Sequence, residues 1–226
     1  SHVNFEGYRI WRNRSMDDRI ETKEPMPSLI GLITNPALQF ERMKRRPAVA
    51  LPMFIVFVLS VLSAYLYISK DFPDTYTYFG MIIFLWEFLK TGIYLFVSAL
   101  ILWLIATIGG GKTNFVTMFS LASFVGFAKI IGDVINNTVY RFANVPEGTS
   151  FTSLHDVFSA VEPYKSILGV FDIFRVWALV LAAEGLQKAG GASKRASWIA
   201  VAVLFILKFL FACFFGLFAA LFEDIF

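Results

Sequence analysis

Three pairs of oppositely charged residues lie at helical spacing inside otherwise apolar stretches of this 226-residue sequence. The pairs are Glu87 with Lys90, Lys129 with Asp133, and Asp172 with Arg175. Residues three or four apart share one side of a helix, and ionisable groups inside a membrane span are costly enough to indicate function by default. Such a cluster could carry a substrate or a proton across a membrane. It could also hold a helix bundle together, each charge neutralised by its neighbour, and we favour this structural interpretation.

Other kinds of chemistry find no support in the sequence. The two histidines, His2 and His155, have no second metal ligand at a useful spacing, and the single cysteine excludes an internal disulfide. The glycines at 109–111 with Lys112 resemble the end of a phosphate-binding loop, but Ala106 stands where that motif needs its first glycine. We therefore expect no metal site, no cofactor and no enzymatic activity.

The composition requires lipid as the main solvent. Hydrophobic residues make up 57% of the chain and charged residues only 16%, with 26 phenylalanines, whereas soluble proteins are roughly half apolar and a quarter charged. So few charges could not build a water-facing surface without large apolar patches. The composition therefore excludes an ordinary soluble enzyme, a disordered chain and a disulfide scaffold.

Five apolar stretches are long enough to cross a membrane, for which about 20 residues are needed. We predict an all-α membrane protein with spans at about 48–69, 79–108, 114–139, 166–187 and 197–222. The three charge pairs fall at similar depth in the second, third and fourth spans. Small residues let membrane helices approach closely, and the candidate packing positions are Gly126, Ala182, Gly185, Gly216 and Ala220.

The positions of the basic residues predict the orientation. Nine precede the first span and four lie in the loops after the second and fourth spans, against three in the opposite loops. Because short cytoplasmic loops are enriched in Lys and Arg, we predict a cytoplasmic N-terminus and an outer C-terminus.

The segment before the first span has two parts. Residues 1–27 are polar and are predicted to form a cytoplasmic tail. Residues 28–46 combine apolar positions at helical spacing with a basic cluster formed by Arg42, Lys44, Arg45 and Arg46. This pattern fits a helix that lies in the cytoplasmic interface on anionic lipid. It also fits a plain topology signal beside the first span, which we slightly favour.

Several short motifs between about residues 28 and 222 are shared with a known family. They are LIGL at 29–32, NPALQF at 35–40, GGKTNF at 110–115, FDIFRVWALVL at 171–181 with EGL at 184–186, and SKRA at 193–196. Together they resemble the Yip-domain family, membrane proteins named for Ypt/Rab interaction in eukaryotes and widespread in bacteria. The resemblance implies a five-span bundle with a cytoplasmic N-terminus and a role in binding or assembly.

The Asp-Leu-Tyr-Gly-Pro motif of the eukaryotic members is absent, so the chain looks more like the bacterial branch. Some members of that branch accompany exporters of the ATP-binding-cassette (ABC) type and help to protect against secreted toxic peptides. We therefore expect a five-span Yip-like domain at 28–226 in the cell membrane, the bacterial cytoplasmic membrane, acting as a non-enzymatic adaptor or assembly factor for an ABC-type exporter.

The alternative is a small transporter or channel that uses the charged cluster. The expected partners are the lipid bilayer and another membrane protein, an ABC-type exporter being the leading candidate. Self-association stays open, and we expect no nucleic acid.

Overall fold

The computed structural model describes residues 25–71, 74–143, 145–146 and 149–222. Most of the predicted N-terminal tail therefore lies outside the described residues. Within them every regular element is a helix, which confirms the all-α prediction. The helices are α2 (Leu29–Thr34), α3 (Pro36–Arg45), α4 (Ala50–Asp71), α5 (Thr75–Ile108), α6 (Phe115–Phe142), α7 (Leu154–Val157), α8 (Tyr164–Leu168), α9 (Ile173–Lys188) and α10 (Lys194–Phe222).

Four of these helices are long and apolar enough to cross a membrane. The stretches are Ala50–Lys70, Tyr78–Ile108, Phe115–Phe142 and Lys194–Leu221, which belong to α4, α5, α6 and α10. They correspond to the first, second, third and fifth predicted spans. The predicted count of five spans therefore depends on α9.

The predicted span at 166–187 is not one continuous helix. The chain leaves α8 at Leu168 and begins α9 only at Ile173. The break has a local cause, because the Asp172 carboxylate accepts a hydrogen bond from the backbone N–H of Arg175 at 2.9 Å and so caps α9. With 16 residues, α9 rises roughly 24 Å, which is less than the roughly 30 Å of a hydrocarbon core.

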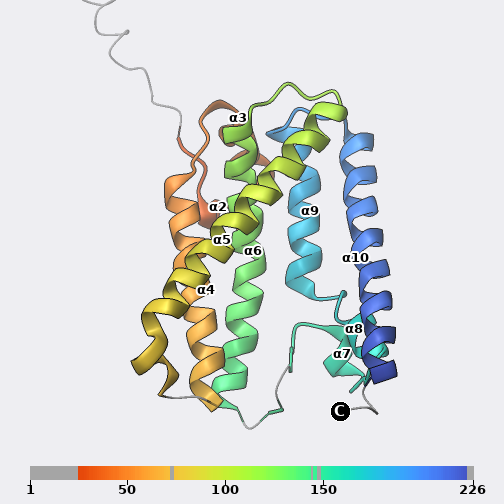
Figure 1. Ribbon diagram of the computed structural model, residues 1–226. Coiled ribbons are helices and arrows are strands. Elements are labelled where there is room, and N and C mark those ends of the chain that lie inside the picture. Colours follow the sequence, from red (N-terminus) through yellow and green to blue (C-terminus); the bar gives the residue numbers. More distant parts are fainter. Residues whose placement is uncertain (1–24, 72–73, 144, 147–148, 223–226) are drawn as a thin grey trace, which may run out of the picture.

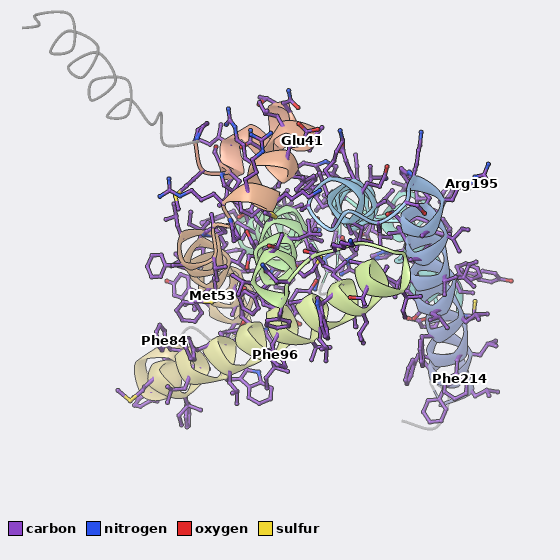
Figure 2. The ribbon with its side chains drawn as sticks, turned by 90° about the horizontal axis from the view of Figure 1, so that it is seen from above. Glu41, Met53, Phe84, Phe96, Arg195 and Phe214 are labelled. Atoms are coloured by element: carbon purple, nitrogen blue, oxygen red, sulfur yellow. The ribbon has the colours of Figure 1, made fainter. Side chains whose placement is uncertain are left out.

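The helix α6 lies at the centre of the bundle (Figure 1) and packs against α4, α5 and α9. The helix α5 crosses α6 diagonally, and α10 stands at the edge of the molecule, where it packs mainly on α8 and α9. The view from above shows the same arrangement, with α5 along one side and α10 at the edge (Figure 2). Most of the surface of α10 is therefore left for lipid or for another protein.

The apolar core occupies the half of the bundle that α2 and α3 close. Its fully buried side chains come from α2 and α3, from the C-terminal half of α5, from the N-terminal half of α6 and from α9; examples are Leu32, Phe40, Ala106, Phe124 and Leu186. Buried side chains in such a core interdigitate with few voids. This half is called the packed half below.

The helices α2 and α3 form because each has a side-chain cap. Ser28 accepts from the backbone N–H of Gly31 at 3.0 Å, and Asn35 accepts from that of Leu38 at 3.1 Å, with Pro36 in the first turn of α3. The structure confirms helix at the proposed interfacial segment. The apolar face of α3, with Phe40 and Met43 fully buried, packs into the protein rather than into lipid.

The glycine run at 109–111 is a tight turn between α5 and α6, as its mismatch to a phosphate-binding loop indicated. Gly110 has a φ of 81°, which suits glycine. A Cβ on Gly111 would lie 2.2 Å from the carbonyl oxygen of Gly190. The turn is therefore packed against the loop between α9 and α10.

Candidate functional site

The half of the bundle away from α2 and α3 contains a polar cavity of about 680 Å³ between α4, α5, α6 and α9. Five of the six residues of the predicted charged cluster line it: Glu87, Lys90, Lys129, Asp133 and Arg175. Serine, threonine, asparagine and tyrosine side chains supply most of the remaining polar lining. This half is called the hollow half below.

A second cavity of about 410 Å³ lies beside the first, between α8, α9, α10 and the loop that follows α6. Its charged lining comes from three places. Arg175 belongs to α9 and Asp172 directly precedes that helix, while Glu162 and Lys165 lie at α8 and Lys208 belongs to α10. Ser150 and Arg175 line both cavities. The structure therefore brings the whole predicted cluster together around two adjoining cavities.

Glu87 and Lys90 form the ion pair that their spacing predicts. The distance between Lys90 Nζ and Glu87 Oε1 is 2.5 Å. The Glu87 side chain is 6% exposed, whereas that of Lys90 is 54% exposed. The buried carboxylate is thus neutralised by a cation that can itself reach the surface.

Lys129 and Asp133 do not form the expected ion pair. The Lys129 ammonium instead lies over the ring of Tyr94 on α5, with Nζ 4.5 Å from the ring centroid, a cation–π arrangement. Asp133 lines the same cavity as Lys129 and Arg175. The helical spacing places Lys129 and Asp133 on one face of α6, but the Lys129 ammonium contacts the Tyr94 ring of α5 instead of the Asp133 carboxylate.

Asp172 and Arg175 are neighbours without a side-chain pair. The Asp172 carboxylate is occupied by the backbone N–H of Arg175 and by the hydroxyl of Thr152. Thr152 in turn accepts a hydrogen bond from Asn136 Nδ2 at 2.7 Å, which ties the loop to α6. The guanidinium of Arg175 is left to line the two cavities.

Two polar residues of this network had a weak signal in the sequence. Asn136 and Asn137 follow Lys129 and Asp133 on α6, and the two side chains bond in different directions. Asn137 Nδ2 donates to Ser63 Oγ at 2.9 Å and so joins α6 to α4. Ser63 had no such signal, because a lone hydroxyl residue in an apolar span carries no distinguishing pattern.

The predicted packing residues lie in different surroundings. Gly185 meets Leu121 of α6 so closely that a Cβ would lie 2.2 Å from Cδ1, and Gly126 faces Leu95 of α5. Ala182 is buried in the core, while Ala220 is half-buried on α10. Gly216 contacts Pro163 and Ser166 at α8 rather than another long helix.

The basic cluster of Arg42, Lys44, Arg45 and Arg46 ends α3 and begins the link to α4. Beside it, Glu41 Oε1 lies 2.6 Å from Lys188 Nζ, which ties α3 to the end of α9. The hydrogen bond from Lys188 holds the pKa of the Glu41 carboxyl below its usual range. The cluster therefore lies at the packed end of the bundle.

His155 is buried in the short helix α7, with Nδ1 2.9 Å from Ser153 Oγ and Nε2 3.3 Å from Asp156 Oδ2. The three residues belong to one tight turn that also fixes Ser150, whose backbone N–H donates to Asp156. Among the residues that the structure describes, no three His, Cys, Asp or Glu side chains are grouped so that they could hold a metal ion. We interpret this turn as the structural wall of the second cavity.

Comparison with known proteins finds the Yip1 domain over residues 30–216 of the chain. Among curated proteins, the sequence is 35% identical over 217 residues to "Membrane protein YknW" of Bacillus subtilis (strain 168), which covers 87% of this chain and 93% of that protein. No solved structure gives a significant match.

Proposed function

The chain belongs to the Yip1-domain family of membrane proteins, as its short motifs predicted, and from this premise we propose that it is a non-enzymatic adaptor in the bacterial cytoplasmic membrane. It binds an ABC-type exporter, helps to assemble it and so contributes to protection against toxic peptides. The observation that carries the proposal is the surface of α10. A membrane helix that its own chain hardly covers is suited to receive the helix of another protein.

The exposed surface of α10 is rich in aromatic side chains. Phe211, Phe214, Phe215 and Phe218 are each more than half exposed. Two of these rings also contact each other, since Phe214 and Phe215 meet edge to face with their centroids 5.4 Å apart. Large, rigid side chains of this kind dominate the energy of protein interfaces.

The adaptor proposal includes a five-span topology with the packed end in the cytoplasm. The basic residues at the end of α3 and in the loops after α5 and α9 gather at this end, where Ser193 N–H donates to the Gly109 carbonyl at 3.3 Å and Glu41 pairs with Lys188. Such an accumulation of Lys and Arg is typical of the cytoplasmic side. In this topology the short helix α9 serves as the fourth of the five spans, because α6 and α10 shield it on either side.

Copurification tests the adaptor proposal. A tagged chain is solubilised in mild detergent from membranes of its own organism, and the exporter subunits in the eluate are identified by mass spectrometry. We expect an ABC-type exporter to copurify with the wild type. A chain that brings down no exporter, and whose deletion leaves exporter assembly intact, contradicts the proposal.

A matched pair of variants locates the contact. Replacing Phe211 and Phe214 on α10 by alanine is expected to reduce copurification at least tenfold, because aromatic anchors carry most of the energy of an interface. Replacing Phe84 and Trp86 on α5, which are also exposed, should leave copurification unchanged. Equal losses in both variants would place the contact elsewhere.

A second candidate function is transport through the hollow half. It is favoured by the volume of the first cavity and by the five charged side chains on its wall. In vesicles that contain the purified protein, transport predicts that neutralising one charge, as in Glu87→Gln, abolishes flux. If removing Glu87 and Lys90 together leaves flux unchanged, the pair only holds helices together.

A further inference from the structure

Three cationic side chains around the two cavities have no carboxylate partner among the residues that the structure describes. These are Lys129 of α6, Arg175 of α9 and Lys208 of α10, and none of them lies at ion-pair distance from an acid. Lys129 is fourteen residues into the 28-residue α6, and Lys208 is fourteen residues into the 29-residue α10. Both cations thus lie near the middle of their helices, where a membrane protein compensates charge most strictly.

The nearby acids are mostly occupied by other groups. Glu87 is paired with Lys90, and Asp172 accepts from Thr152 and from the backbone of Arg175. At the loop end of the second cavity, Glu162 and Lys165 contribute one charge of each sign. Because hydrogen bonds from neutral groups leave Asp172 charged, three unpaired cations face two carboxylates, those of Asp133 and Asp172.

The charges around Lys208 also show an excess of positive over negative influence. Four charged groups act most strongly on its ammonium: Arg175, Lys129, Asp172 and Asp133, in order of decreasing strength. The two repulsive interactions are each stronger than either attractive one. The two basic neighbours therefore repel the Lys208 ammonium more than the two acids attract it, and a mobile anion would relieve this repulsion.

The cavities provide room for such an anion and a route to it. Arg175 lines both of them, Lys129 lines the first and Lys208 lines the second. Ser150, in the loop at the end of the hollow half, also lines both. Arginine with lysine is a donor set that proteins use for phosphate, since the fork of arginine matches two oxygens of one group and a lysine ammonium adds positive charge.

We propose that Lys129, Arg175 and Lys208 bind a phosphate-class oxyanion where the two cavities meet. Arg175 contacts it from α9, and the two lysines approach from α6 and α10. The oxyanion is either the headgroup of an anionic lipid or a free phosphate group. This inference does not rest on the adaptor role, because it concerns the interior of the hollow half and not the outer surface of α10.

Thermal unfolding of the full chain tests the proposal. The protein is placed in phosphatidylcholine nanodiscs, and its melting temperature is followed by tryptophan fluorescence in two series. One series exchanges chloride for inorganic phosphate at constant ionic strength, and the other adds phosphatidylglycerol to the discs. Near saturation we expect the melting temperature to rise by about 3 °C or more.

Substitutions on one helix give a matched comparison. Lys208→Gln should weaken the apparent affinity about tenfold, as expected for loss of one charged contact. Lys194→Gln, an exposed lysine at the start of the same helix, should leave it unchanged. Arg175→Gln should weaken it further, and Arg175→Lys keeps the charge and provides a folded alternative if Arg175→Gln does not fold.

The two series distinguish the source of the anion. A response to inorganic phosphate identifies a free oxyanion as ligand, whereas a response to phosphatidylglycerol alone identifies a lipid headgroup. Either response supports the proposal if Lys208→Gln reduces it and Lys194→Gln does not. The absence of both responses, or a response that persists unchanged in Lys208→Gln and in the folded Arg175 variant, overturns it.

Discussion

The packed and hollow halves of the bundle share α6 and α9 but fill the space between helices differently. In the packed half, apolar side chains such as Phe40, Phe124 and Leu181 are almost completely buried against one another. In the hollow half, α4, α5 and α6 present charged and polar groups to each other and leave a cavity. Charged side chains need counter-charges or solvent, so they cannot close an interior as apolar groups do.

The comparison also shows how helix spacing is set. Gly185 brings α9 against Leu121 of α6 in the packed half. In the hollow half, Lys129 of α6 and Arg175 of α9 line the first cavity instead. Substitutions of similar size should therefore have different consequences in the two halves.

The largest loss of stability is expected when a buried side chain is removed from the packed half. Phe40→Ala removes a fully buried ring and should lower the free energy of unfolding by about 3–5 kcal/mol. The measurement is the melting temperature in detergent. Ile30→Ala on the neighbouring helix, where the side chain is 80% exposed, serves as the control and should change little. If the two variants melt alike, the packed half is not packed as described.

The second-largest difference in stability between the two halves is expected when a side chain is enlarged. Gly185→Val places new atoms against Leu121 and should destabilise the protein by about 1–3 kcal/mol. Ala64→Val adds similar volume at the wall of the first cavity and should be tolerated. The double variant Gly185→Val with Leu121→Ala should recover part of the loss in the same unfolding assay. Equal costs for Gly185→Val and Ala64→Val would remove the distinction between the halves.

The ion pair of the hollow half should have a smaller effect. Glu87→Gln leaves Lys90 without its partner and should cost about 1–3 kcal/mol, since Glu87 is buried. The double variant Glu87→Gln with Lys90→Gln should cost less than the sum of the single changes, which a double-mutant cycle measures. Strict additivity would show that the 2.5 Å contact contributes no coupling.

The smallest effect belongs to the exposed pair at the packed end. Glu41→Gln breaks the contact with Lys188, but water screens it, so the melting temperature near neutral pH should stay within experimental error. Because the folded-state pKa of Glu41 is lowered, its contribution is present above the ordinary carboxyl pKa and is lost as the pH falls through the lowered value. A large effect of Glu41→Gln at neutral pH would make α3 more dependent on this pair than we propose.

The sequence was sufficient to predict the four long apolar helices and one of the three expected ion pairs. Long apolar stretches specify α4, α5, α6 and α10, and the spacing of Glu87 and Lys90 specifies their ion pair. It was not sufficient for Lys129, whose partner Tyr94 comes from another helix. Nor does the spacing of Asp172 and Arg175 show whether the carboxylate pairs with a side chain or caps a helix. In the structure the Asp172 carboxylate caps the N-terminus of α9, and the predicted span at 166–187 is interrupted there.

The proposed topology, with the packed end in the cytoplasm, predicts that the cavity of the hollow half is reached from the outer aqueous phase and that the packed half is closed. The test places single cysteines in a Cys213→Ala background, at Ser60 on the wall of the first cavity or at Ser123, which is fully buried in α6. Intact cells are treated with a small membrane-impermeant thiosulfonate. We predict modification of Ser60→Cys, and modification of Ser123→Cys only after denaturation. Protection of Ser60→Cys, or equal modification of both cysteines in intact cells, would contradict the account.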